Sequence, residues 1–273
     1  MFSRNCWRHP ERERPDSPPN DRFERPGVKP RRPRKRALQR FSFILIPGAG
    51  GSAWYWHLVV PKLQRRGHEA VPVELPAADD RAGLPQYAAT VVRAIGSRDP
   101  NRVVLVAQSL AGFTLPLVCK RVRVAMLVLV NAMIPKPGET PGEWWGNTGH
   151  GEAKRRQNVR DGRKADAPFD PLIDFFHDVP QPVIDKAWAQ GEPHQSETVF
   201  GSPCTFKAWP AVPTRVLVGR DDRFFPAEFQ RRVARERLGM SAEEMNGGHL
   251  LALSQPAELS KRLTAYVATK RAG

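Results

Sequence analysis

A serine within a run of small residues is the first feature that suggests chemistry. Ala107-Gln108-Ser109-Leu110-Ala111 directly follows an apolar stretch at 103–106, and Gly112 adds another small residue. A serine hydroxyl can attack an acyl carbonyl when it stands on a tight strand-to-helix turn, whose flanking residues must be small. The usual motif has glycine two positions before and after the serine, and here alanine occupies both places. Ser109 is therefore a candidate nucleophile, with an ordinary strand end as the alternative interpretation.

Candidate acids and a candidate base follow the serine along the chain. Asp221 and Asp222 come directly after an apolar stretch, and Gly247-Gly248-His249 precedes the last helical stretch. A nucleophile on such a turn is followed by its partners in the order Ser, Asp, His, so His249 is the predicted base. Asn131 also ends an apolar stretch, and its amide can orient a histidine but not stabilise its charge. Each residue alone has a structural explanation, but their joint order favours a catalytic group.

Two backbone N–H groups are candidates for binding the negative charge that develops on an attacked carbonyl. One belongs to Leu110, directly after the serine. The other comes from the glycine turn at 47–51 (Pro-Gly-Ala-Gly-Gly), where we assign it to Ala49. This turn lacks the G-x-G-x-x-G spacing and the lysine of nucleotide-binding loops, so we expect no cofactor.

Six short apolar stretches must position these residues. They lie at about 41–46, 70–73, 103–106, 124–130, 214–218 and 245, and helices are expected near 54–66, 86–95, up to 120, 226–238 and 256–268. Strands without polar alternation, separated by helices, indicate a mostly parallel sheet with helices on both faces. Ligands bind at the carboxyl ends of such strands, where Ser109 and the acid pair are expected. Pro116 is expected to kink the third helix.

Two segments depart from this alternation. Residues 133–210 are rich in Pro, Gly and Trp and predict an inserted helical lid, in which Trp144 and Trp145 either line an apolar substrate pocket or pack the lid. Residues 1–40 hold 13 Lys/Arg and 5 Asp/Glu and predict a disordered basic Arg/Pro-rich tail, which leaves 41–273 as the domain. The tail has three interpretations: a nucleic-acid arm, a solvated segment, or an unused upstream start. We do not expect nucleic acid as a partner.

Composition excludes several other classes of protein. The net charge is +15, but residues 1–40 contribute +8 of it, so the domain itself is only moderately basic. Three scattered cysteines predict neither a disulfide framework nor a zinc site, and His150, His177 and His194 are too irregularly spaced to predict a metal. Without a signal peptide or an apolar stretch of roughly 20 residues, we expect a cytoplasmic protein with no membrane partner. The oligomeric state stays open.

The chain from Phe41 onward resembles the α/β-hydrolase-fold enzymes, and within them the branch of plant-type methylesterases and hydroxynitrile lyases. The most specific part is 222–230 (Asp-Arg-Phe-Phe-Pro-Ala-Glu-Phe-Gln), which looks like the acid loop and following helix of that branch. The family spacing of glycine, two residues, then acid implies Asp222 rather than Asp221 as the acid. Pro47 departs from the His-Gly usual at the oxyanion turn, as Ala107 and Ala111 depart at the serine turn.

The residue after the histidine bears on reaction type. The resemblance implies a lysine there in the lyases and an apolar residue in the esterases, and this chain has Leu250, which also becomes a candidate pocket residue. The expected activity is cofactor-independent hydrolysis of a small, fairly apolar carboxylic ester through an acyl-enzyme. The alternatives are a lyase or other non-ester activity on the same residues, and a catalytically weak protein that binds a small molecule.

Overall fold

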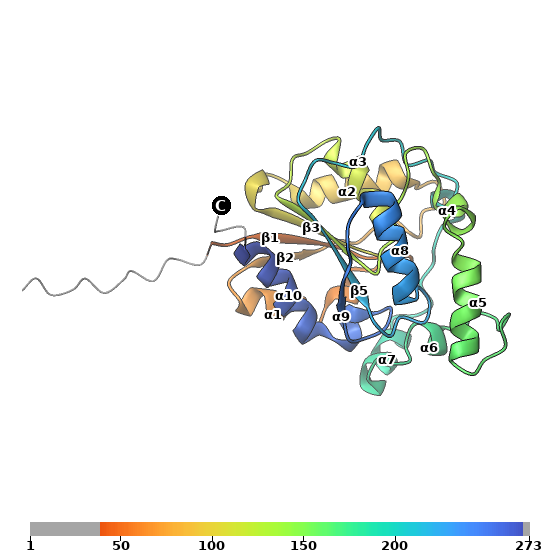
Figure 1. The fold of residues 1–273 in the computed structure, drawn as a ribbon. Coiled ribbons are helices and arrows are strands. Elements are labelled where there is room, and N and C mark those ends of the chain that lie inside the picture. Colours follow the sequence, from red (N-terminus) through yellow and green to blue (C-terminus); the bar gives the residue numbers. More distant parts are fainter. Residues whose placement is uncertain (1–38, 270–273) are drawn as a thin grey trace, which may run out of the picture. The chain divides into compact units, whose positions relative to one another are not determined.

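The computed structural model describes residues 39–269, which form a six-stranded sheet with helices (Figure 1). The strands are β1 (Ser42–Ile46), β2 (Glu69–Pro72), β3 (Val103–Gln108), β4 (Met126–Val130), β5 (Thr214–Gly219) and β6 (Glu243–Met245). Their order is β2-β1-β3-β4-β5-β6, and every neighbouring pair is parallel. The predicted parallel sheet is thus confirmed. Apart from Gln39 and Arg40, the predicted tail lies outside the described residues.

The central strands are apolar at all positions except Gln108 because helices cover both faces of the sheet. β3 is buried at all six of its positions and β4 at all five. On one face Leu105 packs with α2 (Leu84–Ile95), α3 (Thr114–Cys119) and α8 (Ala227–Leu238). On the other face Val104 and Val106 pack with α1 (Val60–Arg65) and α10 (Pro256–Thr269), as the two helix layers of Figure 1 show. Successive strand residues therefore bury into opposite cores.

Two predicted helices differ from expectation at their first turns. The helix expected at 54–66 is divided into a 3-10 turn, η1 (Ala53–Trp56), and α1. Ser52 caps η1 by accepting the Trp54 N–H at 3.2 Å. Before α3 the chain forms another 3-10 turn, η3 (Ser109–Phe113), so Pro116 falls in the first turn of α3. Amides in a first turn have no partner within the helix, so the proline costs α3 no hydrogen bond of its own.

A helical insertion separates β4 from β5. It contains α4 (Pro141–Thr148), α5 (His150–Arg160), α6 (Pro171–Asp174) and α7 (Gln181–Trp188), which lie together at the end where the strands finish, on the right in Figure 1. Thr140 and Glu143 form a capping box at the start of α4, with the hydroxyl accepting the Glu143 N–H at 3.1 Å. Between residues 39 and 269, no helix has the length and apolar character needed to cross a membrane.

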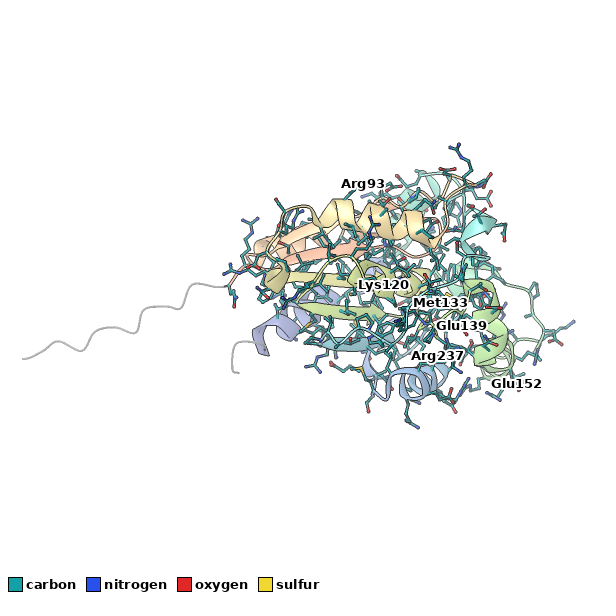
Figure 2. The ribbon with its side chains drawn as sticks, turned by 90° about the horizontal axis from the view of Figure 1, so that it is seen from above. Arg93, Lys120, Met133, Glu139, Glu152 and Arg237 are labelled. Atoms are coloured by element: carbon teal, nitrogen blue, oxygen red, sulfur yellow. The ribbon has the colours of Figure 1, made fainter. Side chains whose placement is uncertain are left out.

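A buried ion pair connects the start of the insertion to α8. The side chains of Glu139 and Arg237 are each 3% exposed and form a hydrogen-bonded pair (Figure 2). Arg237 also donates to the Ile134 carbonyl at 2.5 Å, and Asn147 donates to Glu139 at 2.9 Å. Burial alone would raise the pKa of Glu139, but the hydrogen bonds from Arg237, Lys136 N–H and Asn147 outweigh it and hold that pKa below its usual value. The pair is therefore charged at neutral pH.

Removing the arginine of this pair is expected to destabilise the fold strongly. Arg237→Ala leaves the Glu139 charge buried without its partner, which should lower the free energy of unfolding by about 3–5 kcal/mol. Urea unfolding followed by tryptophan fluorescence measures the change. Lys261→Ala is the control, because Lys261 pairs with Glu258 on an exposed face and should leave the midpoint nearly unchanged. Equal midpoints for the two variants would contradict the role given to the buried pair.

Candidate active site

Ser109 stands at the carboxyl end of β3, on the turn into η3. Its φ of +51° lies in the left-handed region, which residues other than glycine seldom adopt. Its carbonyl accepts the Met133 N–H at 2.9 Å, which fixes the turn against the chain leaving β4. The residue is 8% exposed, so its hydroxyl lies in a nearly closed site. The strained, buried turn is the geometry that the serine pattern predicts for a nucleophile.

The close approach behind this turn falls on Gly112 rather than on the two alanines. Ala107 and Ala111 are buried in the core, where a methyl group fits. A Cβ at Gly112 would lie 1.8 Å from the Met133 carbonyl oxygen. Alanine at the two usual glycine positions is therefore compatible with the turn, because the tightest contact lies one residue further on.

Gly112→Ala is expected to disrupt this turn. The added methyl group cannot be accommodated unless the backbone at Met133 moves, which should cost about 1–3 kcal/mol of unfolding free energy or more, as overpacking does. Thermal unfolding measures the loss. Gly146→Ala provides the matched control, because Gly146 lies within α4 with no atom inside 4 Å of its added Cβ. That variant should be neutral or stabilised by up to about 1 kcal/mol, and a Gly112→Ala protein as stable as this control would contradict the close approach.

His249 and Asp222 lie in hydrogen-bonding register with Ser109. The His249 Nε2 atom is 3.2 Å from Ser109 Oγ, and its Nδ1 atom is 2.9 Å from Asp222 Oδ2. His249 is 1% exposed and Asp222 is 2% exposed. When Nδ1 carries its proton toward the carboxylate, Nε2 is left to accept the serine proton. Three residues far apart in the sequence thus meet at the carboxyl edge of the sheet.

Four donors surround the Asp222 carboxylate. Its Oδ1 atom accepts the N–H groups of Phe224 at 2.9 Å and Phe225 at 2.7 Å. Its Oδ2 atom accepts from Gln230 Nε2 at 3.2 Å in addition to His249. The carboxylate is therefore fixed in one orientation.

The neighbouring Asp221 has a different position. Its side chain is exposed and accepts the Gly247 N–H at 3.0 Å, so Asp222 rather than Asp221 contacts the imidazole.

Asn131 contacts the backbone of the histidine loop. It is fully buried, with a φ of +43°, and its Nδ2 atom donates to the carbonyls of Gly248 at 2.9 Å and His249 at 3.1 Å. Its Oδ1 atom accepts the Gly219 N–H at 2.7 Å. Asn131 thus holds the loop that carries His249, whereas the sequence suggested a contact with the imidazole ring.

The glycine turn after β1 lies directly against Ser109. A Cβ at Gly48 would lie 2.8 Å from Ser109 Cβ, so a side chain there would occupy the space beside the serine. Ala49 is exposed, and its N–H donates no hydrogen bond to any residue between 39 and 269. Leu110 is the second residue of η3, directly after the serine. Of the two amides assigned to the oxyanion site, that of Leu110 directly follows the candidate nucleophile. That of Ala49 lies in the glycine turn that contacts it.

Three phenyl rings surround the His249 imidazole. Phe175 stacks on it at 4.8 Å between ring centroids, Phe225 contacts it at 5.0 Å and Phe224 at 5.3 Å. Phe175 comes from the insertion, and Phe169, which is 50% exposed, contacts Phe175 at 4.9 Å. Sequence reasoning missed this apolar shell. The pair Phe224-Phe225 directly after the acid was a usable signal, because residues beside an acid loop lie beside the imidazole.

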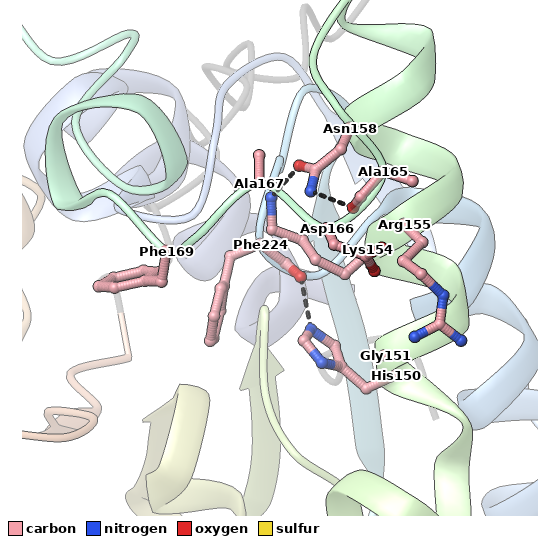
Figure 3. Close-up of a pocket in the computed structure, with 10 residues that line it drawn as sticks. All are labelled: His150, Gly151, Lys154, Arg155, Asn158, Ala165, Asp166, Ala167, Phe169 and Phe224. Carbon is pink, nitrogen blue, oxygen red and sulfur yellow. Dashed lines mark hydrogen bonds between the residues drawn. The ribbon is translucent and has the colours of Figure 1, made fainter.

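The candidate pocket residues occupy different surroundings. Trp144 is 1% exposed and donates its indole N–H to the Ile134 carbonyl at 3.1 Å, so its role is packing, one of the two alternatives left open by the sequence. Trp145 is half-buried and contacts Phe224 at 5.8 Å, and Leu250 is half-buried beside His249. These residues do not line the cavity of about 330 Å³ shown in Figure 3, which is bounded by Phe224, α5 and the following loop.

The three histidines of the insertion do not come together. His150 lines the cavity of Figure 3, and its Nε2 atom donates to the Phe224 carbonyl at 2.7 Å. Burial lowers the pKa of His150, so its ring is neutral at pH 7. His194 is paired with Asp80 at 3.0 Å, and His177 contacts Gly248. Across residues 39–269, no group of three or more His, Cys, Asp or Glu side chains is arranged to hold a metal ion.

A comparison with models of protein families identifies the family of this chain. The model of the alpha/beta hydrolase family matches residues 43–262. The chain belongs to the alpha/beta hydrolase family. The fold and the family resemblance predicted from the sequence are therefore confirmed.

The chain is similar to plant esterases over part of its length. It is 33% identical to the probable esterase PIR7A of Oryza sativa subsp. indica over 110 residues, which are 37% of this chain and 42% of the rice protein. It is 30% identical to methylesterase 3 of Arabidopsis thaliana over 113 residues, 37% of this chain and 43% of that protein. The matched region thus spans about two fifths of these relatives.

Solved structures show the same fold over a longer region. The crystal structure of polyneuridine aldehyde esterase has a TM-score of 0.66 at 20% identity, covering 84% of this chain and 100% of that chain. A pyrethroid hydrolase from Sphingobium faniae JZ-2 has a TM-score of 0.65 at 19% identity, covering 84% of this chain and 98% of that chain. At such identities the likeness concerns the fold.

Proposed function

We propose that this hydrolase cleaves a small, fairly apolar carboxylic ester with a Ser-His-Asp triad. The observation that carries the proposal is the hydrogen-bonded series from Asp222 through His249 to Ser109, with distances of 2.9 and 3.2 Å. The similarity to rice and Arabidopsis proteins named as esterases supports ester hydrolysis among the chemistries open to such a triad. Leu250, in the place of the lysine of the related lyases, supports the same choice.

The proposed reaction has two steps. As Ser109 Oγ attacks the ester carbonyl, His249 Nε2 takes the serine proton, and the Asp222 carboxylate stabilises the imidazolium that forms. The Ala49 and Leu110 N–H groups donate to the oxyanion of the tetrahedral intermediate. The imidazolium returns the proton to the departing alcohol, which leaves an acyl group on the serine. A water molecule deprotonated by His249 then attacks this acyl-enzyme and releases the carboxylic acid.

The insertion is proposed to act as a lid over these residues. Its Phe175 ring stacks on His249, and Ser109 is only 8% exposed, so a substrate needs this segment to move before it can reach the serine. The phenyl rings around the imidazole favour an apolar acyl or alcohol group by burying it away from water. A small ester with apolar substituents therefore fits the surroundings of the nucleophile.

Covalent labelling tests the proposal. A fluorophosphonate probe should react with the wild-type protein, and peptide mapping should place the label on Ser109. A panel of short-chain, aryl and methyl esters should then show which is hydrolysed. A folded protein that is neither labelled nor active on any ester would contradict the proposal, and ester binding without turnover would support the alternative of a small-molecule-binding protein.

A further inference from the structure

Residues 175–178 of the insertion (Phe-Phe-His-Asp) contact the histidine loop at two places. The Phe175 ring stacks on the His249 imidazole, with an angle of 16° between the ring planes. Three residues later, Asp178 Oδ2 accepts the Gly248 N–H at 2.6 Å. One short segment therefore contacts both the imidazole ring and the backbone of the preceding residue.

The absence of a side chain at Gly248 permits this contact. A Cβ at Gly248 would lie 2.6 Å from His177 Cε1 and 2.8 Å from Asp178 Oδ1. Any other residue at this position would have to displace the side chains of His177 and Asp178. Gly248 thus leaves room for the side chains of the insertion beside the histidine loop.

The other contacts of the loop come from the sheet. Asp221, after β5, accepts the Gly247 N–H at 3.0 Å. Asn131, after β4, donates to the Gly248 and His249 carbonyls at 2.9 and 3.1 Å. The loop is therefore held by the sheet on one side and by Asp178 of the insertion on the other.

We infer that Asp178 is a positioning residue, which couples the place of the insertion to the orientation of His249 through the Gly248 amide. The inference rests on the proposed function. His249 must keep Nδ1 on Asp222 and Nε2 on Ser109 at the same time, and an error of about 1 Å in such a geometry can cost about 100-fold in rate. The hydrogen bond of 2.6 Å from the Gly248 N–H joins this loop to the insertion, and either a carboxylate or an amide oxygen at residue 178 can accept it.

The surroundings of Asp178 argue against a role in stability alone. Its Oδ1 atom is buried without a hydrogen-bond partner among the described residues. Both ring nitrogens of His177 are likewise buried without a hydrogen-bond partner there. A carboxylate oxygen that gives up water without a new partner opposes folding. Removing the carboxylate relieves this penalty but also leaves the buried Gly248 N–H without its acceptor. The two effects on stability oppose each other, so we expect activity to fall more than stability as the histidine loop loosens.

Three variants in the full chain test the inference. Asp178→Ala should lower kcat for p-nitrophenyl acetate by about 10- to 100-fold and change KM by less than about threefold, because the loss concerns the reacting geometry. Asp178→Asn keeps an oxygen for the Gly248 N–H and should stay within about threefold of wild type. Asp185→Ala removes an exposed carboxylate from α7 of the same insertion and should behave as wild type.

The outcomes separate this inference from the proposed function. If the wild-type protein shows no ester hydrolysis that depends on Ser109, the proposed function fails and the inference fails with it. If the wild-type protein is active and Asp178→Ala is equally active, the inference alone is overturned. A loss of activity in both Asp178 variants together with a matching fall in their urea midpoints would also overturn it, since that pattern indicates a structural role.

Discussion

Ser109→Ala is expected to lower kcat for p-nitrophenyl acetate by about 1,000-fold or more, with an unchanged fold. The hydroxyl is the atom that would form the acyl-enzyme, and without it His249 and Asp222 have no nucleophile to activate. What remains is binding and the oxyanion contacts, which account for the residual catalysis of such variants over water. Alanine adopts the same strained backbone about as easily as serine, so the unfolding midpoint should stay within error of wild type.

Ser254→Ala is the matched control for this prediction. The Ser254 hydroxyl is buried without a partner within residues 39–269, and it ends α9 (Leu251–Ser254), which directly follows the histidine loop. Its removal should leave hydrolysis unchanged. Steady-state rates of the two purified variants at one pH provide the comparison. A Ser109→Ala protein that retains more than a tenth of wild-type kcat would show that the nucleophile lies elsewhere.

The sheet was predictable because its central strands are short and almost wholly apolar. Val103–Gln108 and Met126–Val130 are buried on both faces, so the sequence shows no alternation and indicates a covered parallel sheet. The single helix expected at 54–66 is instead a 3-10 turn followed by a shorter α-helix. Pro61 lies at the start of α1, and the chain before it forms a separate 3-10 turn. A helical pattern predicts a helix, but it does not say where a turn of another type interrupts it.

Contacts made by the insertion were beyond sequence reasoning. Trp144 and Phe175 are both aromatic residues of the same segment, yet Trp144 packs into the core and Phe175 stacks on His249. The difference depends on how the insertion folds back over the sheet, which local pattern does not encode. The same holds for Asp178, whose partner Gly248 is 70 residues away. Nothing in the spacing of the two residues indicates that they meet.

Asp222→Asn is expected to lower kcat by about 10⁴-fold, through the tautomer of the histidine. Asp222 Oδ1 accepts two backbone N–H groups, those of Phe224 and Phe225, and backbone amides cannot become acceptors. The oxygen of the new amide must therefore remain at that position, which turns its NH₂ group toward His249 Nδ1. The imidazole must then accept at Nδ1 and carry its proton on Nε2, where it can no longer take the proton of Ser109.

Asp221→Asn tests whether this effect belongs to the position rather than to the loss of a charge near the site. Asp221 is exposed, and an asparagine oxygen can still accept the Gly247 N–H, so its kcat should stay within about threefold of wild type. Both variants lose one negative charge from adjacent residues, which makes the pair a close comparison. Equal losses in the two would assign the effect to the electrostatic field of the site, and a larger loss in Asp221→Asn would exchange the roles of the two acids. A fall confined to Asp222→Asn is the result that follows from the four fixed donors around its carboxylate.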